Sequence, residues 1–188
     1  SGPPNQKIFQ ELSKILSPFD RTIDLVSYSH AQQDHMGSLP EVIERYKAGA
    51  LISNGVGNTI GAYKALMENV KEHNLPNIIL EAGDKIRYKK STIHVIYPTE
   101  AAKVKKQDIN ESSLVLLLES ASTTALFTGD IGTKTEKELI LTMKQWNHET
   151  IDVLKVAHHG SKYSSSKEFL QAANPKIAVI EVGKNSYG

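Results

Sequence analysis

The chain has 188 residues, a formal net charge of +1 and no cysteine. This length suffices for one domain with a hydrophobic core, and a composition of 39% apolar and 23% charged residues excludes disorder. No apolar run approaches the ~20 residues of a membrane-spanning helix. The lack of cysteine excludes disulfides, thiolate metal sites and a cysteine nucleophile, so any metal must be held by His, Asp or Glu.

Strands alternate with helices in the first part of the chain. The spacing of apolar residues predicts, in order, a helix over 8–16, a strand over 22–29, a helix over 38–47, a strand over 50–53, a loop over 54–58 and a helix over 59–73. Ser38 and Glu41 form a potential capping box for the second helix, and Thr59 is the predicted cap of the third.

The second part of the chain is richer in strands. The pattern predicts strands over 77–81, 85–88 and 92–97, a polar loop over 99–112, a hairpin of strands 114–119 and 124–128, a helix over 134–143, a strand over 152–156, a helix over 167–172 and a last strand over 177–182. Mixed βα units and meandering strands indicate an α/β protein with two sheets flanked by helices, in a single domain over residues 1–188.

Ionisable side chains gather just after three predicted strands, where open α/β sheets place their sites. The first cluster is His30, Asp34 and His35, the second is Asp130, and the third is His158 with His159. Burying so many ionisable groups together is costly unless a metal ion neutralises them. The H-x-x-x-D-H spacing suits two ions about 3.5–4 Å apart with Asp130 shared, and imidazoles with carboxylates suit Zn²⁺ or Mn²⁺.

These clusters resemble a known family. His30-x-x-x-Asp34-His35-x-Gly37 is similar to the H-x-H/D-x-D-H motif of the metallo-β-lactamase superfamily. Segments along nearly the whole chain, among them FDRTIDLVSYSH, LFTGD and DVLKVAHHGSKYSSS, resemble the metallo-β-lactamase-like domain of ComEC-type DNA-uptake (competence) proteins. The resemblance implies an αββα sandwich, a divalent-metal centre and phosphodiester hydrolysis.

The resemblance also implies roles for individual residues. By position, metal ligands fall on His30, Gln32, Asp34, His35, Asp130 and the pair His158 and His159, of which His159 is preferred. Asp34 and Asp130 are the expected catalytic residues, which hold and orient the attacking water. Expected substrate contacts are Asn110, Ser113, Ser161, Ser164 and Ser165, although the serines suit an N-cap equally well. The family's first strands, which carry a D-V-G-Q-G-D segment, precede Ser1, so the chain is expected to be a fragment of a longer protein.

Gln32 departs from the family pattern, which has Asp at this position, or His in the wider superfamily. A neutral amide in place of a carboxylate weakens one of two metal sites, because hard divalent ions prefer anionic oxygen. We therefore expect one tightly bound ion, at Asp34, His35, Asp130 and a histidine of the 158–159 pair, and a second ion that is weakly bound or absent.

A local excess of six positive charges lies within residues 85–106. The basic residues are Lys85, Arg87, Lys89, Lys90, Lys103, Lys105 and Lys106, against the single acid Glu100. Such a strip attracts a phosphate backbone by counterion release, and a solvated face is the alternative interpretation. Tyr88 and Tyr97 are candidates for stacking on bases, although tyrosines in strands more commonly pack.

Three functions follow as hypotheses. The first is a metal-dependent phosphodiesterase, a nuclease acting on DNA during competence-type uptake. The second, favoured by Gln32, is a catalytically weakened DNA-binding or assembly module of the same fold, and the third is a metallo-hydrolase of another ester. By resemblance the partners are DNA and a membrane channel domain of the parent protein, on the extracytoplasmic face. A stand-alone chain would be cytoplasmic and soluble, and we expect no membrane contact by the chain itself.

Overall fold

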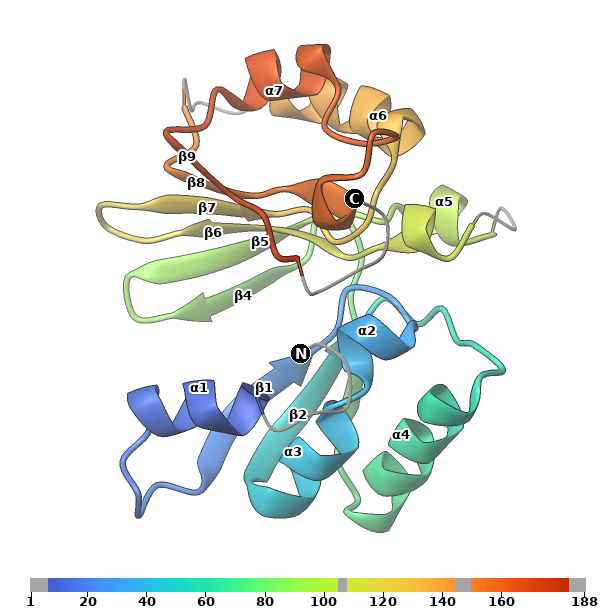
Figure 1. Ribbon diagram of the computed structural model, residues 1–188, viewed down its shortest axis with the longest axis vertical. Helices are drawn as coiled ribbons and strands as arrows, with labels where there is room; N and C mark the ends of the chain where they lie inside the picture. The colour runs from blue at the N-terminus through green and yellow to red at the C-terminus, as the bar shows by residue number, and fades with distance from the viewer. Residues whose placement is uncertain (1–6, 105–107, 145–149, 183–188) are drawn as a thin grey trace. The chain divides into compact units, whose positions relative to one another are not determined.

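The computed structural model describes residues 7–104, 108–144 and 150–182 (Figure 1). The backbone divides into two compact units, Ser1–Leu80 and Glu81–Gly188, and each is built around its own sheet. Within the described ranges, no helix combines the length and apolar character needed to cross a membrane.

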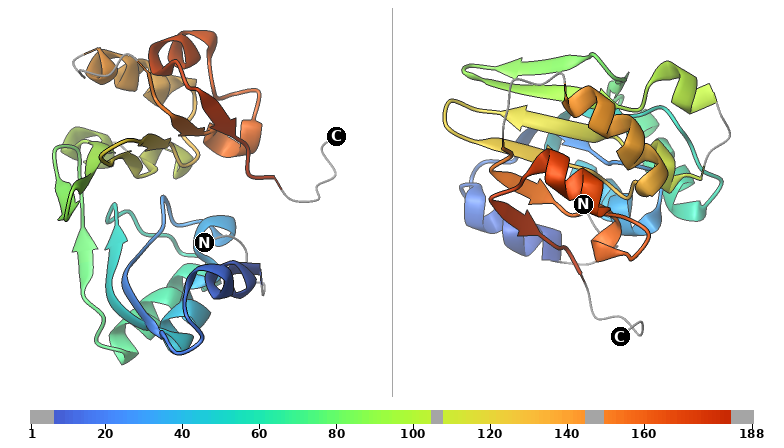
Figure 2. Two further views of the ribbon diagram at one scale, coloured as in Figure 1. Left: turned by 90° about the vertical axis from the view of Figure 1, so that its left-hand side faces the viewer. Right: turned by 90° about the horizontal axis from the view of Figure 1, so that it is seen from above.

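The first unit is a parallel sheet in the order β1-β2-β3 with helices on one face. Its elements are α1 (Lys7–Ile15), β1 (Thr22–Ser27), α2 (Gln33–Met36), α3 (Leu39–Arg45), β2 (Lys47–Ser53), α4 (Gly61–Glu72) and β3 (Asn77–Ile79). Helical crossovers of one hand in this strand order place α3 and α4 on the same face, as Figure 2 (left) shows. Val26 and Leu51 of the sheet and Ile43 and Leu66 of the helices are buried in its core.

The second unit is a six-stranded sheet in the order β4-β5-β6-β7-β8-β9. Its elements are β4 (Lys85–Tyr88), β5 (Ser91–Tyr97), α5 (Glu100–Val104), η1 (Asn110–Ser112), β6 (Val115–Glu119), β7 (Thr124–Phe127), α6 (Thr133–Met143), β8 (Val153–Lys155), η2 (Ala157–Gly160), α7 (Lys167–Ala173) and β9 (Ile177–Val179). Strands β4 to β7 pair antiparallel, and β7, β8 and β9 pair parallel.

The core of the second unit lies on one face of its sheet. Leu117, Leu126 and Leu154 are register partners on neighbouring strands, so their side chains project to the same side. They belong to one buried cluster with Leu139 of α6 and Phe169 of α7. The helices between the parallel strands therefore cover this face.

Most predicted elements are confirmed within a few residues, and three predictions are wrong. The segment expected to be a loop over 99–112 contains α5 and η1. Ser38 precedes α3 as expected, but in the described structure its side chain makes no capping hydrogen bond. Helix α4 has Ile60 rather than Thr59 at its N-cap.

In each unit, the parallel strands end at a common edge. In the first unit β1 and β2 run in the same direction, so the loops after Ser27 and Ser53 leave the sheet at the same edge. In the second unit the segments after Phe127, Lys155 and Val179 leave the sheet together for the same reason. These edges carry the three clusters of ionisable residues.

Candidate metal centre

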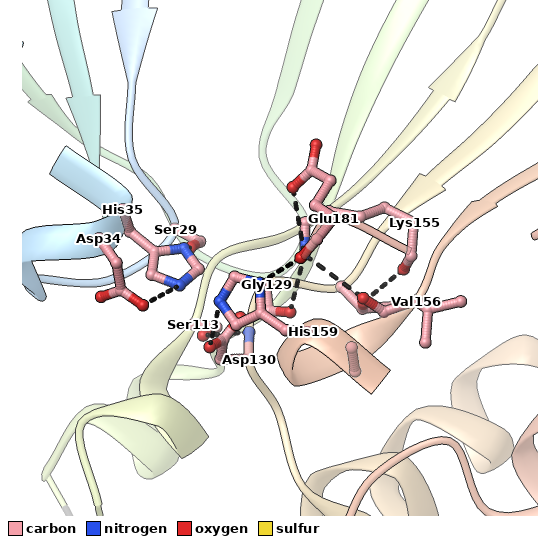
Figure 3. A network of polar contacts seen from close by, with 12 residues as sticks. Ser29, Asp34, His35, Ser113, Gly129, Asp130, Lys155, Val156, His159 and Glu181 are labelled. Carbon is pink, nitrogen blue, oxygen red and sulfur yellow. Dashed lines mark hydrogen bonds and ion pairs between the residues drawn. The ribbon is translucent and has the colours of Figure 1, made fainter. Parts of the chain in front are cut away.

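The loop after β1 carries three of the predicted ligands. The carbonyl oxygen of Gln32 accepts hydrogen bonds from the backbone amides of His35 and Met36, at 3.1 Å each, which opens the short helix α2. This helix places Asp34 beside His35, with Asp34 Oδ2 3.6 Å from His35 Nε2 (Figure 3). The loop thus presents one carboxylate oxygen and one imidazole nitrogen together.

His30 is buried and packs against the same imidazole. The ring centroids of His30 and His35 are 4.1 Å apart, with the rings tilted by 45°. The hydroxyl oxygen of Ser29 lies 3.1 Å from Nδ1 of His30 and 3.2 Å from Nδ1 of His35. A single hydroxyl therefore faces both rings and helps to fix their orientation.

A buried tyrosine joins β1 to this loop. Burial and the neighbouring Tyr63 raise the pKa of Tyr28 to about 12, and hydrogen bonds with Ser53 and Tyr63 complete its surroundings. Tyr28 thus links the end of β1 to Ser53 at the end of β2 and to Tyr63 of α4.

In the second unit, Asp130 follows β7 and only 1% of its surface is exposed. Its backbone N–H donates to Ser113 Oγ at 3.0 Å, which fixes the position of the main chain. His159 Nε2 lies 3.4 Å from Asp130 Oδ2, and His159 Nδ1 lies 2.7 Å from the carbonyl oxygen of Glu181 (Figure 3). His159 is thus held between a carboxylate and a backbone carbonyl.

The contact with Glu181 decides which nitrogen of His159 carries the proton. A carbonyl oxygen only accepts, so Nδ1 must donate and Nε2 of the neutral ring presents a lone pair. When the ring is neutral, that lone pair faces Asp130 Oδ2 at 3.4 Å, and two acceptors then lie together. A cation satisfies both, and metal-binding histidines commonly donate their other N–H to a carbonyl in this way.

The two carboxylate–imidazole pairs have a spacing that suits two ligands of one metal ion. Ligands bound tetrahedrally to Zn²⁺ at about 2.0–2.1 Å lie roughly 3.3–3.4 Å from one another. The Asp130–His159 pair is separated by 3.4 Å and the Asp34–His35 pair by 3.6 Å. Each unit therefore carries one carboxylate–imidazole pair with a spacing that fits a divalent ion.

The backbone around the two adjacent histidines is strained. His158 and His159 have φ of 49° and 55°, in the left-handed region that non-glycine residues rarely adopt. The His158 ring stands edge-on to His159 at a centroid distance of 6.5 Å, while its amide donates to the carbonyl of Gly129 at 3.2 Å. Of the two histidines, His159 faces Asp130, and it is also the one preferred as a ligand from the sequence. Its assignment as a metal ligand stays a prediction.

The predicted substrate-binding serines make structural contacts in the described chain. Ser113 accepts the Asp130 amide, and Ser161 Oγ accepts the amide of Tyr163 at 3.3 Å. Ser164 Oγ lies 3.0 Å from the carbonyl oxygens of Ala157 and Ser161. The N-cap alternative falls on the neighbouring Ser166, whose side chain accepts the amide of Phe169.

Two further members of the predicted substrate set also take part in the local structure. Asn110 begins η1, and its carbonyl accepts the amide of Ser113 at 3.0 Å. The backbone amide of Ser165 donates to Glu136, and Ser165 itself has φ of 59°. The contacts of Asn110, Ser165 and the other serines with a substrate remain predictions.

The basic strip is partly described. Lys103 forms an ion pair with Glu81 at 3.2 Å, and Lys105 and Lys106 lie outside the described residues. Tyr88 is 67% exposed, and the ammonium nitrogen of Lys89 lies 4.9 Å from the centroid of its ring. Tyr88 therefore remains a candidate for stacking on bases. Tyr97 is only 2% exposed and belongs to the core, so for this residue the packing alternative is confirmed.

Two kinds of residue were missed by sequence reasoning. Asn54 and Asn58 reach from the loop after β2 to residues 29–35, which we call the ligand loop. Lys155 and Glu181 support the segments that carry Asp130 and His159. The two asparagines could have been found from the sequence, because their loop follows a predicted strand next to the one that precedes the first cluster. Glu181 acts through its backbone carbonyl, which no side-chain pattern reveals.

The chain belongs to the metallo-beta-lactamase superfamily, whose family model matches residues 1–183. Among solved structures, Igni18, a metallo hydrolase from Ignicoccus hospitalis, aligns with a TM-score of 0.57 at 16% identity, over 94% of this chain and 69% of that one. A B3 metallo-beta-lactamase with an active-site glutamic acid aligns with the same TM-score at 14% identity, over 89% and 71%. These neighbours confirm the predicted fold class. The superfamily to which the chain belongs implies binding of a divalent metal.

The curated relatives include competence proteins of the ComEC type. ComE operon protein 3 of Bacillus subtilis is 31% identical over 178 residues, which is 92% of this chain and 22% of the relative. Recombination protein 2 of Haemophilus influenzae is 28% identical over 83% of this chain and 17% of its own length. Competence protein ComA of Neisseria gonorrhoeae is 39% identical over 44% of this chain and 12% of its own length. The chain thus spans about a fifth or less of each of these proteins.

Proposed function

We propose that this chain is a metal-dependent phosphodiesterase that cleaves DNA during competence-type uptake. The observation that carries the proposal is the Asp130–His159 pair, in which a buried carboxylate faces the acceptor nitrogen of an oriented imidazole. The Asp34–His35 pair adds a second carboxylate and a second imidazole, 3.6 Å apart, in the other unit. Since Zn²⁺ takes four ligands in most protein sites, we propose that both pairs belong to one ligand set.

Each residue of this ligand set has a proposed role in hydrolysis. A bound divalent ion lowers the pKa of water and stabilises negative charge on a phosphodiester. Asp34 and Asp130 accept hydrogen bonds from the attacking water and orient it, since their carboxylates are the anionic oxygens of the set. Ser113 and Glu181 keep Asp130 and His159 in place through the hydrogen bonds already described. We propose His30, Gln32 and His158 as residues of a second, weaker metal position.

DNA is the proposed substrate because the curated relatives are competence proteins and because β4 and its turn carry Lys85, Arg87, Lys89 and Lys90. These cations, with Lys103, Lys105 and Lys106, are proposed to hold the phosphate backbone beside the metal centre. As part of a longer competence-type protein, the chain would work next to a membrane channel domain on the extracytoplasmic face.

The test of the proposed function is Asp130→Asn, which keeps the shape of the side chain and removes its charge. We expect metal-dependent cleavage of labelled single- and double-stranded DNA, with Mn²⁺, Mg²⁺ or Zn²⁺ added, to fall by more than the roughly 10–100-fold that removal of a supporting partner costs. Circular dichroism and thermal unfolding should show that the variant is folded.

The matched control is Asp24→Asn, at an exposed position of β1. This control should cleave DNA at the wild-type rate. If Asp130→Asn cleaves DNA at the wild-type rate, Asp130 does not belong to the active site and the proposed function is wrong.

A catalytically weakened DNA-binding or assembly module is the second candidate, and Gln32 favours it because this amide brings no charge to the ligand loop. Elemental analysis separates the two candidates. DNA binding without bound metal or cleavage would support the module, whereas hydrolysis of a lactone or another ester, but not of DNA, would support a different metallo-hydrolase.

A further inference from the structure

We infer that Asn58, together with Asn54, is a positioning residue that fixes the ligand loop, defined as residues 29–35. The inference rests on the proposed metal centre, because the ligand loop carries His30, Asp34 and His35. Both asparagines belong to the loop between β2 and α4, which leaves the same edge of the sheet as the ligand loop.

The two side-chain amides bind the carbonyl groups on either side of His30. Asn58 Nδ2 donates to the carbonyl oxygen of Ala31 at 2.8 Å, and Asn54 Nδ2 donates to that of Ser29 at 3.5 Å. These bonds join residues 27 and 25 positions apart in the sequence. The backbone on both sides of His30 is therefore held by a neighbouring loop.

Each asparagine also uses its oxygen, which fixes the donor end. Asn58 Oδ1 accepts the backbone amides of Thr59 at 2.7 Å and Ile60 at 3.4 Å, just before α4 begins. Asn54 Oδ1 accepts the amide of Val56 at 2.9 Å. Since both oxygens are taken by N–H donors, both NH₂ groups must point toward the ligand loop.

The donor and acceptor roles of Asn58 are separable by substitution. Asn58→Asp keeps an oxygen that accepts the amides of Thr59 and Ile60, and a negative charge suits the N-terminus of α4. It removes the N–H that donates to Ala31 and places a carboxylate against that carbonyl. Asn58→Ala removes both functions. If Asn58 only caps α4, Asn58→Ala should perturb the protein and Asn58→Asp should not. If Asn58 positions the ligand loop, both substitutions should perturb that loop.

Asn77→Asp is the matched control. It adds the same charge to the same unit, and its oxygen still accepts the hydroxyl of Ser53, which lies 3.2 Å from Asn77 Oδ1 in the wild type. The first measurement is amide hydrogen exchange in the metal-free proteins. We expect faster exchange of residues 30–36 in Asn58→Asp and Asn58→Ala, with β2 protected as in Asn77→Asp.

The second measurement is calorimetric titration with Zn²⁺. We expect both Asn58 variants to bind about 10–100-fold more weakly than Asn77→Asp, the usual effect of removing a group that orients ligands. Exchange and affinity in Asn58→Asp equal to those in Asn77→Asp would overturn the inference. If the wild type binds no Zn²⁺, the proposed function fails, and the exchange of residues 30–36 alone decides whether Asn58 positions the loop.

Discussion

His159 combines a strained backbone with an oriented side chain. Its φ of 55° directs the ring toward Asp130, and its Nδ1–H donates to the carbonyl oxygen of Glu181 at 2.7 Å. Left-handed conformations of non-glycine residues cost on the order of 1–3 kcal/mol and cluster at functional sites. The hydrogen bond holds the ring with Nε2 beside Asp130 Oδ2, as the proposed ligand role requires.

Lys155 supports the same region from β8. Its ammonium group donates to the carbonyl oxygens of Gly129 and Val156, at 3.4 Å each, and lies 3.8 Å from a carboxylate oxygen of Glu181. These contacts connect the segments that follow β7, β8 and β9. One largely buried cation thus helps to hold the backbone that carries Asp130 and His159.

Gln32 allows a test of metal stoichiometry. The wild type is expected to bind one divalent ion tightly and a second weakly or not at all, because a neutral amide replaces a carboxylate in the ligand loop. Gln32→Asp should raise the number of ions bound, and calorimetric titration of the metal-free proteins measures it. An increase in hydrolysis should accompany the extra ion.

Gln33→Asp is the control for the added charge, since Gln33 is the exposed neighbour on α2. It should bind metal as the wild type does. Two equally tight sites in the wild type, unchanged by Gln32→Asp, would contradict the expected asymmetry between the two metal positions.

The parallel strands of the second unit are tied to one another and to their helices by two carboxylates. Glu136 of α6 is fully buried and accepts the backbone amides of Ser165 and Ser166, so it holds the turn before α7. At the opposite end of β8, Asp152 accepts the Thr124 amide at 2.7 Å and the Lys176 ammonium at 2.6 Å. Two acids thereby fix both ends of the β8–α7 segment.

Asp152 gives the unit an acid-dependent stability. Its hydrogen bond with Lys176, followed by that from the Thr124 amide, lowers its pKa from 3.8 to about 2. A folded-state pKa below the unfolded value means that the stabilisation is complete above about pH 4 and disappears as the pH falls toward 2. Asp152→Asn should therefore be less stable than the wild type at pH 7, by a margin that narrows below about pH 4.

Urea unfolding of both proteins between pH 7 and about pH 2.5 measures this margin. Because Lys176 is exposed, added salt should reduce the part that is due to the ion pair. A margin that stays constant over the whole pH range would show that the carboxylate charge of Asp152 does not contribute.

The sequence predicted the elements better than the contacts between them. Apolar periodicity located α1, β1, α6 and the β6–β7 hairpin, because burial imposes that periodicity directly. It missed α5 and η1, since short helices in polar segments have little apolar patterning. It also missed Asn58 and Glu181, which act through hydrogen bonds with backbone groups brought close only by the fold.

Across the whole molecule, the proposed ligand set draws on segments distant in sequence. The ligand loop follows the first strand, whereas Asp130 and His159 follow strands of the second sheet. Motif spacing predicted the ligand types, because the clusters follow predicted strands. The tautomer of His159 and the spacing of each carboxylate–imidazole pair came only from the structure.

The basic strip makes a prediction for the whole molecule bound to DNA. Changing Lys85, Lys89 and Lys90 together to Ala should weaken the binding of all DNA sequences about equally. The slope of log affinity against log salt should fall by roughly 0.7–0.9 for each DNA phosphate that is no longer neutralised. Changing Lys103, Lys105 and Lys106 to Ala should also weaken DNA binding and lower the slope. The contribution of Lys103 should be the smallest, because this residue pairs with Glu81.

Fluorescence anisotropy with labelled DNA at several salt concentrations measures these slopes. Replacement of Lys47, Lys64 and Lys71, which are exposed in the first unit, is the charge-matched control. A slope that moves equally in the control and in both strip variants would leave the strip as an ordinary solvated surface.

The left-handed turn at His158, His159 and Gly160 has a consequence for engineering the protein. Glycine or asparagine adopts such angles more readily, so selection for stability alone would favour them at both histidine positions. Natural chains accept such local destabilisation where activity requires a particular side chain. A stabilised variant found by screening for heat resistance is therefore expected to acquire substitutions at His158 or His159. Under the proposed function, replacement of His159 would cost more metal affinity than replacement of His158.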